Sequence, residues 1–333
     1  MMKITVLGAG SWGTTIAILL AKKGYVVSLW EHYKEHVDML NDRRENIKFL
    51  SGVLIPEKVI ITNSLEECLQ GTECIVVVVP SHCVRSVMQR CSSLVKKGMV
   101  IVSAAKGLEQ DTMSTVSQII ESELPTEMIE DIGVLSGPSH AEEVSRQVPT
   151  TVVAAARQEK TAKFIQELFS TPYFRVYTNL DIKGVELGGS LKNVIALASG
   201  ILCGLGFGDN TNAALITRGL TEISRLGVAM GGKLETFFGL SGIGDLVVTC
   251  TSKHSRNRSL GKLIGKGMSF NEALATMIMV AEGVNTTKAA FILSKRLGID
   301  LPITTAIHGV LFEDKKPREA VEDLMTRELK SEW

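Results

Sequence analysis

Short runs of apolar and β-branched residues alternate with amphipathic segments through the first half of the chain. This alternation is typical of a mostly parallel sheet covered by helices. The pattern predicts eight strands, at residues 3–7, 26–30, 59–62, 74–79, 99–104, 132–136, 150–155 and 174–177. Because the amphipathic segments between them supply helices, we expect an α/β fold here.

The pattern changes after Tyr177, where the β-branched runs stop. Apolar residues then recur at helical spacing over 185–205 and 210–230, and in shorter segments up to Leu329. A length of 333 residues also exceeds one typical hydrophobic core. We therefore expect two domains, with residues 1–180 around the sheet and residues 181–333 entirely helical.

A glycine-rich turn follows the first predicted strand, where Gly8, Gly10 and Gly13 have GxGxxG spacing. In dinucleotide-binding folds the first glycine permits the tight turn, the second lets the main chain approach a pyrophosphate, and the third lets helix and strand pack closely. Such glycines also occur for conformational reasons alone. Here strand, turn, helix and second strand follow in the required order, which predicts a Rossmann-like, doubly wound sheet that binds NAD or NADP.

The end of the second predicted strand leaves the choice of cofactor open. Glu31 would hydrogen-bond an adenosine ribose and favours NAD, whereas His32 and Lys34 would accept a 2′-phosphate and favour NADP. All three also fit a solvated helix start.

Polar residues follow other predicted strands. Ligands of open parallel sheets bind beyond the carboxyl ends of the strands, and Lys106, Gly137 and Ser139 lie at such ends. Lys106 is predicted to meet an anionic or carbonyl substrate, although an ordinary loop lysine has the same pattern. Ser139 is predicted to cap a helix whose first turn carries Glu142 and Glu143, a role that needs no ligand.

A cluster of cations lies in the second half, with no acid between Asp245 and Glu272: Lys253, Arg256, Arg258, Lys262 and Lys266. In a chain of zero net charge this cluster predicts a local anion site, helped by a helix start near "SRNR". The alternative is a solvated helical face. Nucleic acid is not expected to bind, because the cluster is short and has no interleaved aromatic residues.

One lysine, Lys192, lies in the otherwise uncharged stretch 187–208. The stretch is long enough to span a bilayer, but it holds six glycines and has no flanking basic cluster. A core helix whose lysine reaches the surface is a second interpretation. We favour a third, a desolvated lysine whose pKa falls below the usual ~10.4 and whose proton is used, with a nearby acid such as Asp245 holding part of the charge.

The charge balance and the cysteines narrow the function further. With 36 basic and 36 acidic side chains, the protein is not expected to bind nucleic acid or membrane surfaces generally. The six cysteines include no CxxC pair and no spacing with histidine that suits zinc, so we expect neither a metal site nor disulfides. No leader is recognised before the first strand, so we expect a cytoplasmic protein without stable membrane insertion.

Several long motifs resemble the bacterial-type NAD(P)-dependent glycerol-3-phosphate dehydrogenases over nearly the whole chain. They are GAGSWGTTIA at 8–17, SAAKGLE at 103–109, LSGPSHAEEV at 135–144, ELGGSLKNVIALASGI at 186–201, GLSGIGDLVVTCTSKHSRNR at 239–258 and VAEGV at 280–284. The chain departs from the family's GPSFA motif at His140.

The resemblance implies reduction of dihydroxyacetone phosphate to sn-glycerol 3-phosphate for glycerophospholipid synthesis, with NADH or NADPH as reductant and no metal. From its place on an apolar helix we predict that Lys192 is the catalytic acid and base. The implied cofactor contacts are Gly8, Gly10, Ser11, Trp12, Gly13, His32, Tyr33, Lys106, Ala141, Arg256, Val280 and Glu282. The implied substrate contacts are Lys106, Gly137, Ser139, Lys192, Asp245, Ser255, Arg256 and Asn257.

Two alternatives stay open. A ketopantoate or 3-hydroxyacid dehydrogenase would keep the glycine turn and a lysine but would not need the SRNR phosphate site. A non-catalytic dinucleotide sensor would have no use for Lys192. The oligomeric state is also open, with a homodimer among the options.

Overall fold

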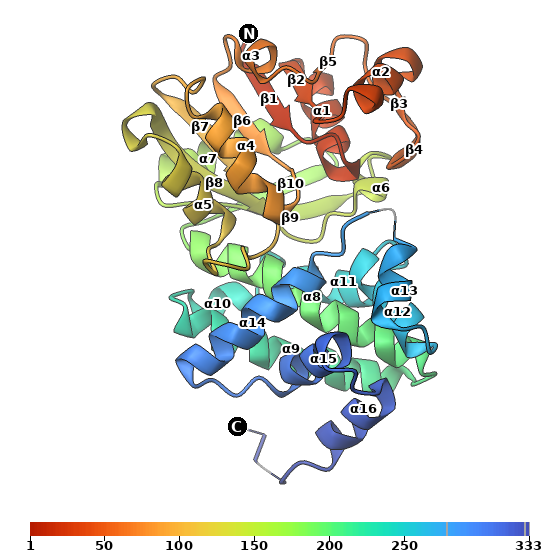
Figure 1. The fold of residues 1–333 in the computed structure, drawn as a ribbon. Helices are drawn as coiled ribbons and strands as arrows, with labels where there is room; N and C mark the ends of the chain where they lie inside the picture. The colour runs from red at the N-terminus through yellow and green to blue at the C-terminus, as the bar shows by residue number, and fades with distance from the viewer. Residues whose placement is uncertain (278, 330, 333) are drawn as a thin grey trace.

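The computed structural model describes residues 1–277, 279–329 and 331–332. Figure 1 shows one part built around a sheet, coloured red to yellow-green, and a second, helical part, coloured green to blue. The N-terminus lies at the outer end of the sheet part and the C-terminus at the outer end of the helical part (Figure 1).

All eight predicted strands form, and they lie in one sheet of order β10-β9-β8-β7-β6-β1-β2-β5. Its strands are β1 Lys3–Leu7, β2 Val26–Trp30, β5 Ile60–Thr62, β6 Cys74–Val77, β7 Met99–Ser103, β8 Ile129–Ser136, β9 Thr150–Ala156 and β10 Phe174–Asn179. Neighbours are parallel except β8 and β9, which are antiparallel. The prediction of a mostly parallel sheet is confirmed.

A small hairpin of β3 Glu45–Asn46 and β4 Leu50–Leu54 was not predicted. Its strands are short, and only Leu50 and Val53 of β4 are buried, so no apolar run marks them.

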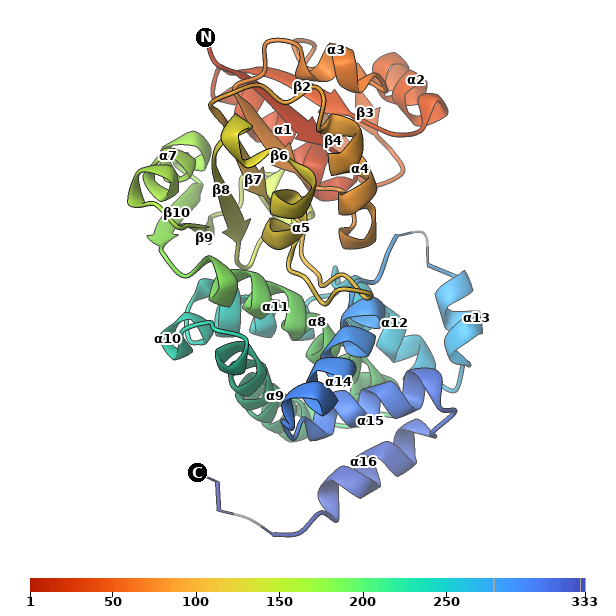
Figure 2. The same ribbon diagram turned by 60° about the vertical axis from the view of Figure 1, so that its left-hand side comes forward.

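Helices cover both faces of the sheet (Figure 2). Alternate residues of β6 point to opposite faces: Cys74 and Val76 join the core of α1, α2 and α7, whereas Ile75 and Val77 join that of α3, α4 and α5. The helical segments of this part are α1 Ser11–Lys22, α2 Lys34–Arg43, α3 Leu65–Leu69, η1 Ser81–Cys83, α4 Val84–Cys91, α5 Val116–Glu123, η2 Thr126–Met128, α6 Ala141–Val144 and α7 Glu159–Phe169.

From Ile182 onward the regular structure of the described residues is helical. The predicted helices at 185–205 and 210–230 correspond to α8 and α9, shifted by a few residues. The segments are α8 Ile182–Gly204, α9 Asp209–Ala229, α10 Leu234–Phe237, η3 Leu240–Gly244, α11 Asp245–Thr251, α12 Arg256–Gly265, α13 Phe270–Ala275, α14 Gly283–Leu297, α15 Pro302–Phe312 and α16 Pro317–Met325.

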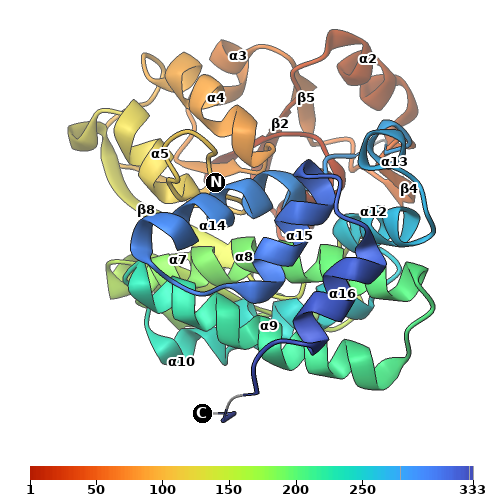
Figure 3. The ribbon, with the colours of Figure 1, turned by 60° about the horizontal axis from the view of Figure 1, so that its bottom comes forward.

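Helix α8 runs through the middle of the helical part and contacts α9, α11, α12 and α14 (Figures 1 and 3). By length and composition α8 is apolar enough to cross a membrane, but 89% of its apolar window is buried inside the protein. Its apolar surface is therefore covered by the neighbouring helices.

Helices α8 and α12 pack with their main chains in close contact. A Cβ atom on Gly200 of α8 would lie 2.1 Å from the carbonyl oxygen of Arg258, and one on Gly261 of α12 would lie 2.1 Å from that of Leu197. Gly204 and Gly265, one turn further along each helix, are equally restricted. This contact explains much of the glycine content of α8, and it fixes the start of α12 relative to Lys192.

Candidate active site

A cavity of about 900 Å³ lies between the sheet part and the helical part. The carboxyl ends of β1, β2, β6 and β7 lead into it from one side, and the starts of α12 and α14 approach it from the other. Of the predicted site residues it is lined by Gly8, Gly10, Ser11, Trp12, Gly13, His32, Tyr33, Lys106, Ser139, Ala141, Lys192, Asp245, Ser255, Arg256, Asn257, Val280 and Glu282. Gly137 stands behind this lining, where its carbonyl oxygen accepts a hydrogen bond from Lys106 Nζ at 3.1 Å.

The glycine turn between β1 and α1 has the shape that a pyrophosphate needs. Gly8 has φ +111°, and a Cβ atom on Gly13 would lie 1.8 Å from the Gly8 carbonyl oxygen. Beside Gly10, in contrast, no atom lies within 4 Å of the Cβ position. No side chain caps the start of α1, so its first amides face this open space and fit a phosphate.

Asn46 of the hairpin supports the glycine turn from behind. Its Nδ2 donates to the Ala9 carbonyl oxygen and to Thr14 Oγ1, both at 2.8 Å. The sequence carries no local signal for this contact, since it depends on how the hairpin folds over the turn.

Three charged side chains meet at the centre of the cavity. Asp245, at the start of α11, binds Lys192 Nζ through Oδ1 and Lys106 Nζ through Oδ2, the latter at 2.7 Å. Lys192 Nζ also donates to Thr249 Oγ1 at 2.8 Å. Lys192 comes from α8 and Lys106 from the loop after β7, so Asp245 joins the two parts of the molecule. Thr249 was not predicted from the sequence, although it lies one helical turn beyond Asp245.

Burial and charge act in opposite directions on this cluster. Burial lowers the pKa of Lys192 to about 7, although the neighbouring Asp245 carboxylate acts to raise it. For Asp245, burial opposes ionisation, but the two lysines outweigh it and hold its pKa below the usual value. Near neutral pH, Lys192 is therefore able both to give and to take a proton.

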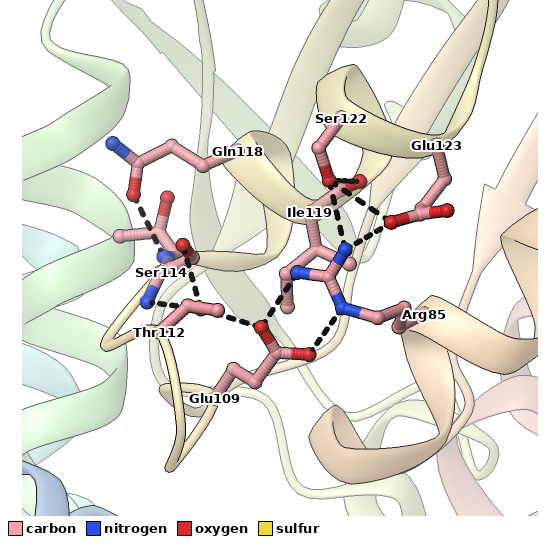
Figure 4. A network of polar contacts seen from close by, with 9 residues as sticks. Arg85, Glu109, Thr112, Ser114, Gln118, Ile119, Ser122 and Glu123 are labelled. Carbon is pink, nitrogen blue, oxygen red and sulfur yellow. Dashed lines mark hydrogen bonds and ion pairs between the residues drawn. The ribbon is translucent and has the colours of Figure 1, made fainter.

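The loop that carries Lys106 is held to the sheet part by Arg85 of α4 (Figure 4). Arg85 Nε and Nη2 donate to the two carboxylate oxygens of Glu109 at 2.8 and 2.6 Å, and Arg85 also binds Glu123 of α5. The bond to Arg85 lowers the pKa of Glu109 despite partial burial. Directly after Lys106, the Gly107 amide donates to Ser190 Oγ of α8 at 2.9 Å.

The predicted anion site is smaller than expected. Arg256 lines the cavity at the start of α12, where Ser255 Oγ accepts from the Arg258 amide at 3.2 Å and caps the helix. Arg258 turns away, and its Nη2 lies 3.5 Å from Cys203 Sγ. Of the five cations, Arg256 is the one among the residues that line the cavity. Lys253 precedes α12, and the helix spreads the later side chains around its axis, so the cavity does not gather all five cations.

Asn257 fixes the start of α12 to its neighbours. Its Nδ2 donates to Asn193 Oδ1 of α8 at 2.9 Å, and its Oδ1 accepts from the Gly283 amide of α14 at 2.9 Å. Both contacts are buried, so Asn257 ties together three helices beside the cavity. Sequence analysis had not identified Asn193.

Ser139 does not cap a helix, contrary to the prediction. Its hydroxyl donates to the Gly137 carbonyl oxygen at 3.0 Å, and α6 begins two residues later, with His140 in the capping position. Glu142 and Glu143 do lie in the first turn of α6, as predicted. His140 lines the cavity 5.8 Å from the ring of His254, and burial lowers its pKa.

Glu282 joins the two parts of the molecule at the edge of the cavity. Its carboxylate accepts from the Ser81 amide at 3.0 Å and from Ser81 Oγ at 2.5 Å. Ser81 follows β6, so the contact crosses from the sheet part to the start of α14.

Within the described ranges, no group of three His, Cys, Asp or Glu side chains is arranged to hold a metal ion. The donors that line the cavity include amides, lysines and two arginines, Arg90 and Arg256, which suit phosphates and a carbonyl oxygen.

Models of one protein family match both parts of the chain. A model described as NAD-dependent glycerol-3-phosphate dehydrogenase N-terminus matches residues 3–162, and one described as the C-terminus of the same family matches residues 181–322. Among curated relatives, the glycerol-3-phosphate dehydrogenase (NAD(P)+) of Citrifermentans bemidjiense is 54% identical and covers 99% of this chain and 98% of its own.

Solved structures agree with the fold. A glycerol-3-phosphate dehydrogenase from Coxiella burnetii superposes with a TM-score of 0.94 at 40% identity, covering 98% of this chain and 99% of its own. A ketopantoate reductase from Ralstonia eutropha reaches a TM-score of 0.64 at 15% identity over 96% of this chain and 100% of its own. At 15% identity, the similarity to the ketopantoate reductase shows a shared fold alone.

Proposed function

The chain belongs to the family of NAD-dependent glycerol-3-phosphate dehydrogenases, and from this we propose that it reduces dihydroxyacetone phosphate to sn-glycerol 3-phosphate with NADH or NADPH. The observation that carries the proposal is the Lys192–Asp245–Lys106 cluster, which faces the cavity beside the start of α12.

We assign the two parts different tasks, with residues 1–180 binding the dinucleotide and residues 181–333 binding the substrate. The glycine turn at Gly8, Gly10 and Gly13 would hold the pyrophosphate, with Ser11, Trp12, His32, Tyr33, Ala141, Val280 and Glu282 as further contacts. Lys106 and Arg256 also line the cavity, and we assign them contacts to both the dinucleotide and the substrate.

Lys192 serves as general acid and base. The bound nicotinamide ring would supply the hydride. Reduction of a ketone leaves negative charge on its oxygen, so the site needs a proton donor there. Lys192 gives that proton in reduction and takes it back in oxidation, and Lys106 adds a second positive charge beside it. Asp245 positions both amines.

The substrate phosphate binds at the start of α12. Ser255, Arg256 and Asn257 bring a guanidinium and the first helix amides to the same wall of the cavity. Ser139 completes the opposite wall, and Gly137 stands behind it, where its carbonyl oxygen orients Lys106.

We place the reaction in the cytoplasm, where its product supplies glycerophospholipid synthesis, and we propose a homodimer that neither inserts in membranes nor binds nucleic acid. The balanced charge of the chain and the burial of α8 support the last two statements. Light scattering coupled to size-exclusion chromatography tests the dimer against a chain mass of 36.1 kDa.

The activity is tested by following NADH and NADPH absorbance with dihydroxyacetone phosphate, dihydroxyacetone, ketopantoate and a 3-oxoacid. We expect turnover with dihydroxyacetone phosphate and poor reaction without the phosphate. Preferred turnover of ketopantoate would replace the proposal with the ketopantoate alternative. Binding of cofactor without turnover of any ketone would favour a dinucleotide sensor.

A further inference from the structure

We propose that the adenosine end of the cavity is built to bind a 2′-phosphate, with Arg90 as the discriminating residue, so that the enzyme prefers NADP(H) to NAD(H). This inference rests on the proposed function, because it names the cofactor that the same site selects.

The acid expected to bind the ribose is engaged elsewhere. Glu31 follows β2 and is 9% exposed. Its Oε1 accepts from the Tyr33 amide at 3.2 Å, and its Oε2 lies 3.4 Å from His36 Nδ1. In NAD-binding folds an acid at this position accepts hydrogen bonds from the ribose hydroxyls. Here Glu31 lines the cavity, but each of its carboxylate oxygens already has a partner in its own loop or in α2, so it has less hydrogen-bonding capacity left for a ribose 2′-hydroxyl.

A cation from another helix lines the same end of the cavity as Glu31. Arg90, on the last turn of α4, lines the cavity, and its guanidinium lies 5.4 Å from the centre of the Trp30 ring. Its Nη1 is 3.5 Å from His32 Nδ1. The ring and the histidine hold the guanidinium beside the end of β2, where the adenosine ribose of a Rossmann-like fold lies.

Arg90 is also available for a ligand. Among the described residues no carboxylate forms an ion pair with Arg90. Its contacts to Trp30 and His32 use only part of the five N–H donors of the guanidinium, so the other donors can bind a ligand. A guanidinium matches a phosphate with two parallel hydrogen bonds, which a 2′-hydroxyl cannot replace.

Lys34, a cation at the start of α2, is a suitable control. Its Nζ binds both carboxylate oxygens of Asp38, at 3.1 and 3.0 Å, and its side chain is 69% exposed. It lies close to the end of β2, at the start of α2, and has the same charge as Arg90, but it does not line the cavity.

The test compares adenosine 2′,5′-bisphosphate with AMP by calorimetry on the full chain, because the two ligands differ only in the 2′-phosphate. Wild-type protein should bind the bisphosphate at least tenfold more tightly, the range for a charge-assisted hydrogen bond. Arg90→Gln should remove most of this ratio, and Lys34→Gln should keep it within about twofold. Arg90→Lys should retain part of it, since the charge stays and the fork is lost.

Kinetics with dihydroxyacetone phosphate give a second measurement. In Arg90→Gln, kcat/KM should fall at least tenfold more with NADPH than with NADH. Equal affinity of the wild-type protein for the two adenosine nucleotides would overturn the inference. So would an equal loss for both nucleotides in Arg90→Gln, because Arg90 would then act only by packing on Trp30. The calorimetry decides even if dihydroxyacetone phosphate is not a substrate, so the two proposals fail separately.

Discussion

At the scale of single residues, the carboxylate of Asp245 matters most, because it holds two lysines that come from different parts of the chain. It is 2% exposed, and Lys192 is 7% exposed. A buried carboxylate with two cationic partners fixes their positions far better than a surface ion pair does. Four predictions follow from this cluster and its neighbour Arg256.

Lys192→Met should lower kcat by about 10²–10⁴, the usual loss when a positioned proton donor is removed. The thioether fills a similar volume without the amine, and Asp245 keeps Lys106 as a partner, so the fold should be retained. Steady-state kinetics and a thermal melt check both points. Turnover like that of the wild type would assign Lys192 a structural role only.

The pH dependence should differ between the two directions of the reaction. With a pKa of about 7 for Lys192, ketone reduction needs the protonated amine, and its kcat should fall as pH rises above about 7. Alcohol oxidation needs the neutral amine, and its kcat should fall as pH drops below about 7.

Asp245→Asn tests whether Lys192, and not another ionisable group, sets the pH dependence of kcat. The Asp245 carboxylate raises the pKa of Lys192, so its removal should move both pH profiles to lower pH. Profiles of kcat against pH, measured at saturating substrate in the wild-type protein and in Asp245→Asn, check this. An unmoved profile would show that a group other than Lys192 titrates.

Arg256→Ala should raise KM for dihydroxyacetone phosphate about tenfold or more, because a charge-assisted hydrogen bond is worth about 1.5–3 kcal/mol. Lys262→Ala is the control, since Lys262 lies on the same helix but does not line the cavity. If both variants behaved alike, the start of α12 would not be the phosphate site.

At the scale of elements, the contact between α8 and α12 joins Lys192, the proposed proton donor, to the proposed phosphate site at the start of α12. Gly261→Ala would place a methyl group 2.1 Å from the Leu197 carbonyl oxygen. We expect a loss of about 1–3 kcal/mol in the free energy of unfolding, as for an overpacked core, together with a raised KM for the phosphate substrate.

Gly309→Ala on α15 is the matched control for that substitution. Its Cβ position has the flexible Lys315 side chain as its nearest neighbour, at 3.3 Å. An alanine there should be neutral or stabilise the helix by up to ~1 kcal/mol. Chemical denaturation gives the free energy of unfolding of both variants. If Gly261→Ala were as stable as Gly309→Ala, α12 would be able to move away from α8 without a loss of stability, and the close contact would not be a constraint.

Elements that are buried on both faces were predictable from sequence. The strands at 74–77 and 99–103 read as apolar runs because helices cover both sides of the sheet. The hairpin of β3 and β4 left no such pattern. The glycines of α8 were visible, but their role was not, because it depends on which helix packs against them.

At the scale of the whole molecule, the site lies where the sheet part and the helical part meet. Residues at strand ends, such as Lys106, were predictable because a parallel sheet gathers those ends at one edge. Contacts between distant segments were not. Ser81 with Glu282, and Arg90 with Trp30, join residues that no motif places together.

Ser81→Ala should loosen the contact between the two parts. Loss of the hydroxyl removes a hydrogen bond to the Glu282 carboxylate, while the Ser81 amide keeps its own. We expect faster hydrogen exchange at the start of α14 and a raised KM for the cofactor. Ser92→Ala is the control, because Ser92 Oγ bonds only to the nearby Gln89 carbonyl. Unchanged exchange in Ser81→Ala would show that the contact is dispensable.

The glycine contact between α8 and α12 also bears on which substrates fit. Lys192 sits on one helix and Arg256 at the start of the other, and no side chain lies between Gly200 and the α12 main chain to be repacked. The two helix backbones therefore hold the Cα atoms of both residues at a fixed spacing. With Lys192 as the proposed proton donor and Arg256 at the proposed phosphate site, we expect a ketose phosphate with more carbons between its carbonyl and its phosphate to be reduced more slowly than dihydroxyacetone phosphate.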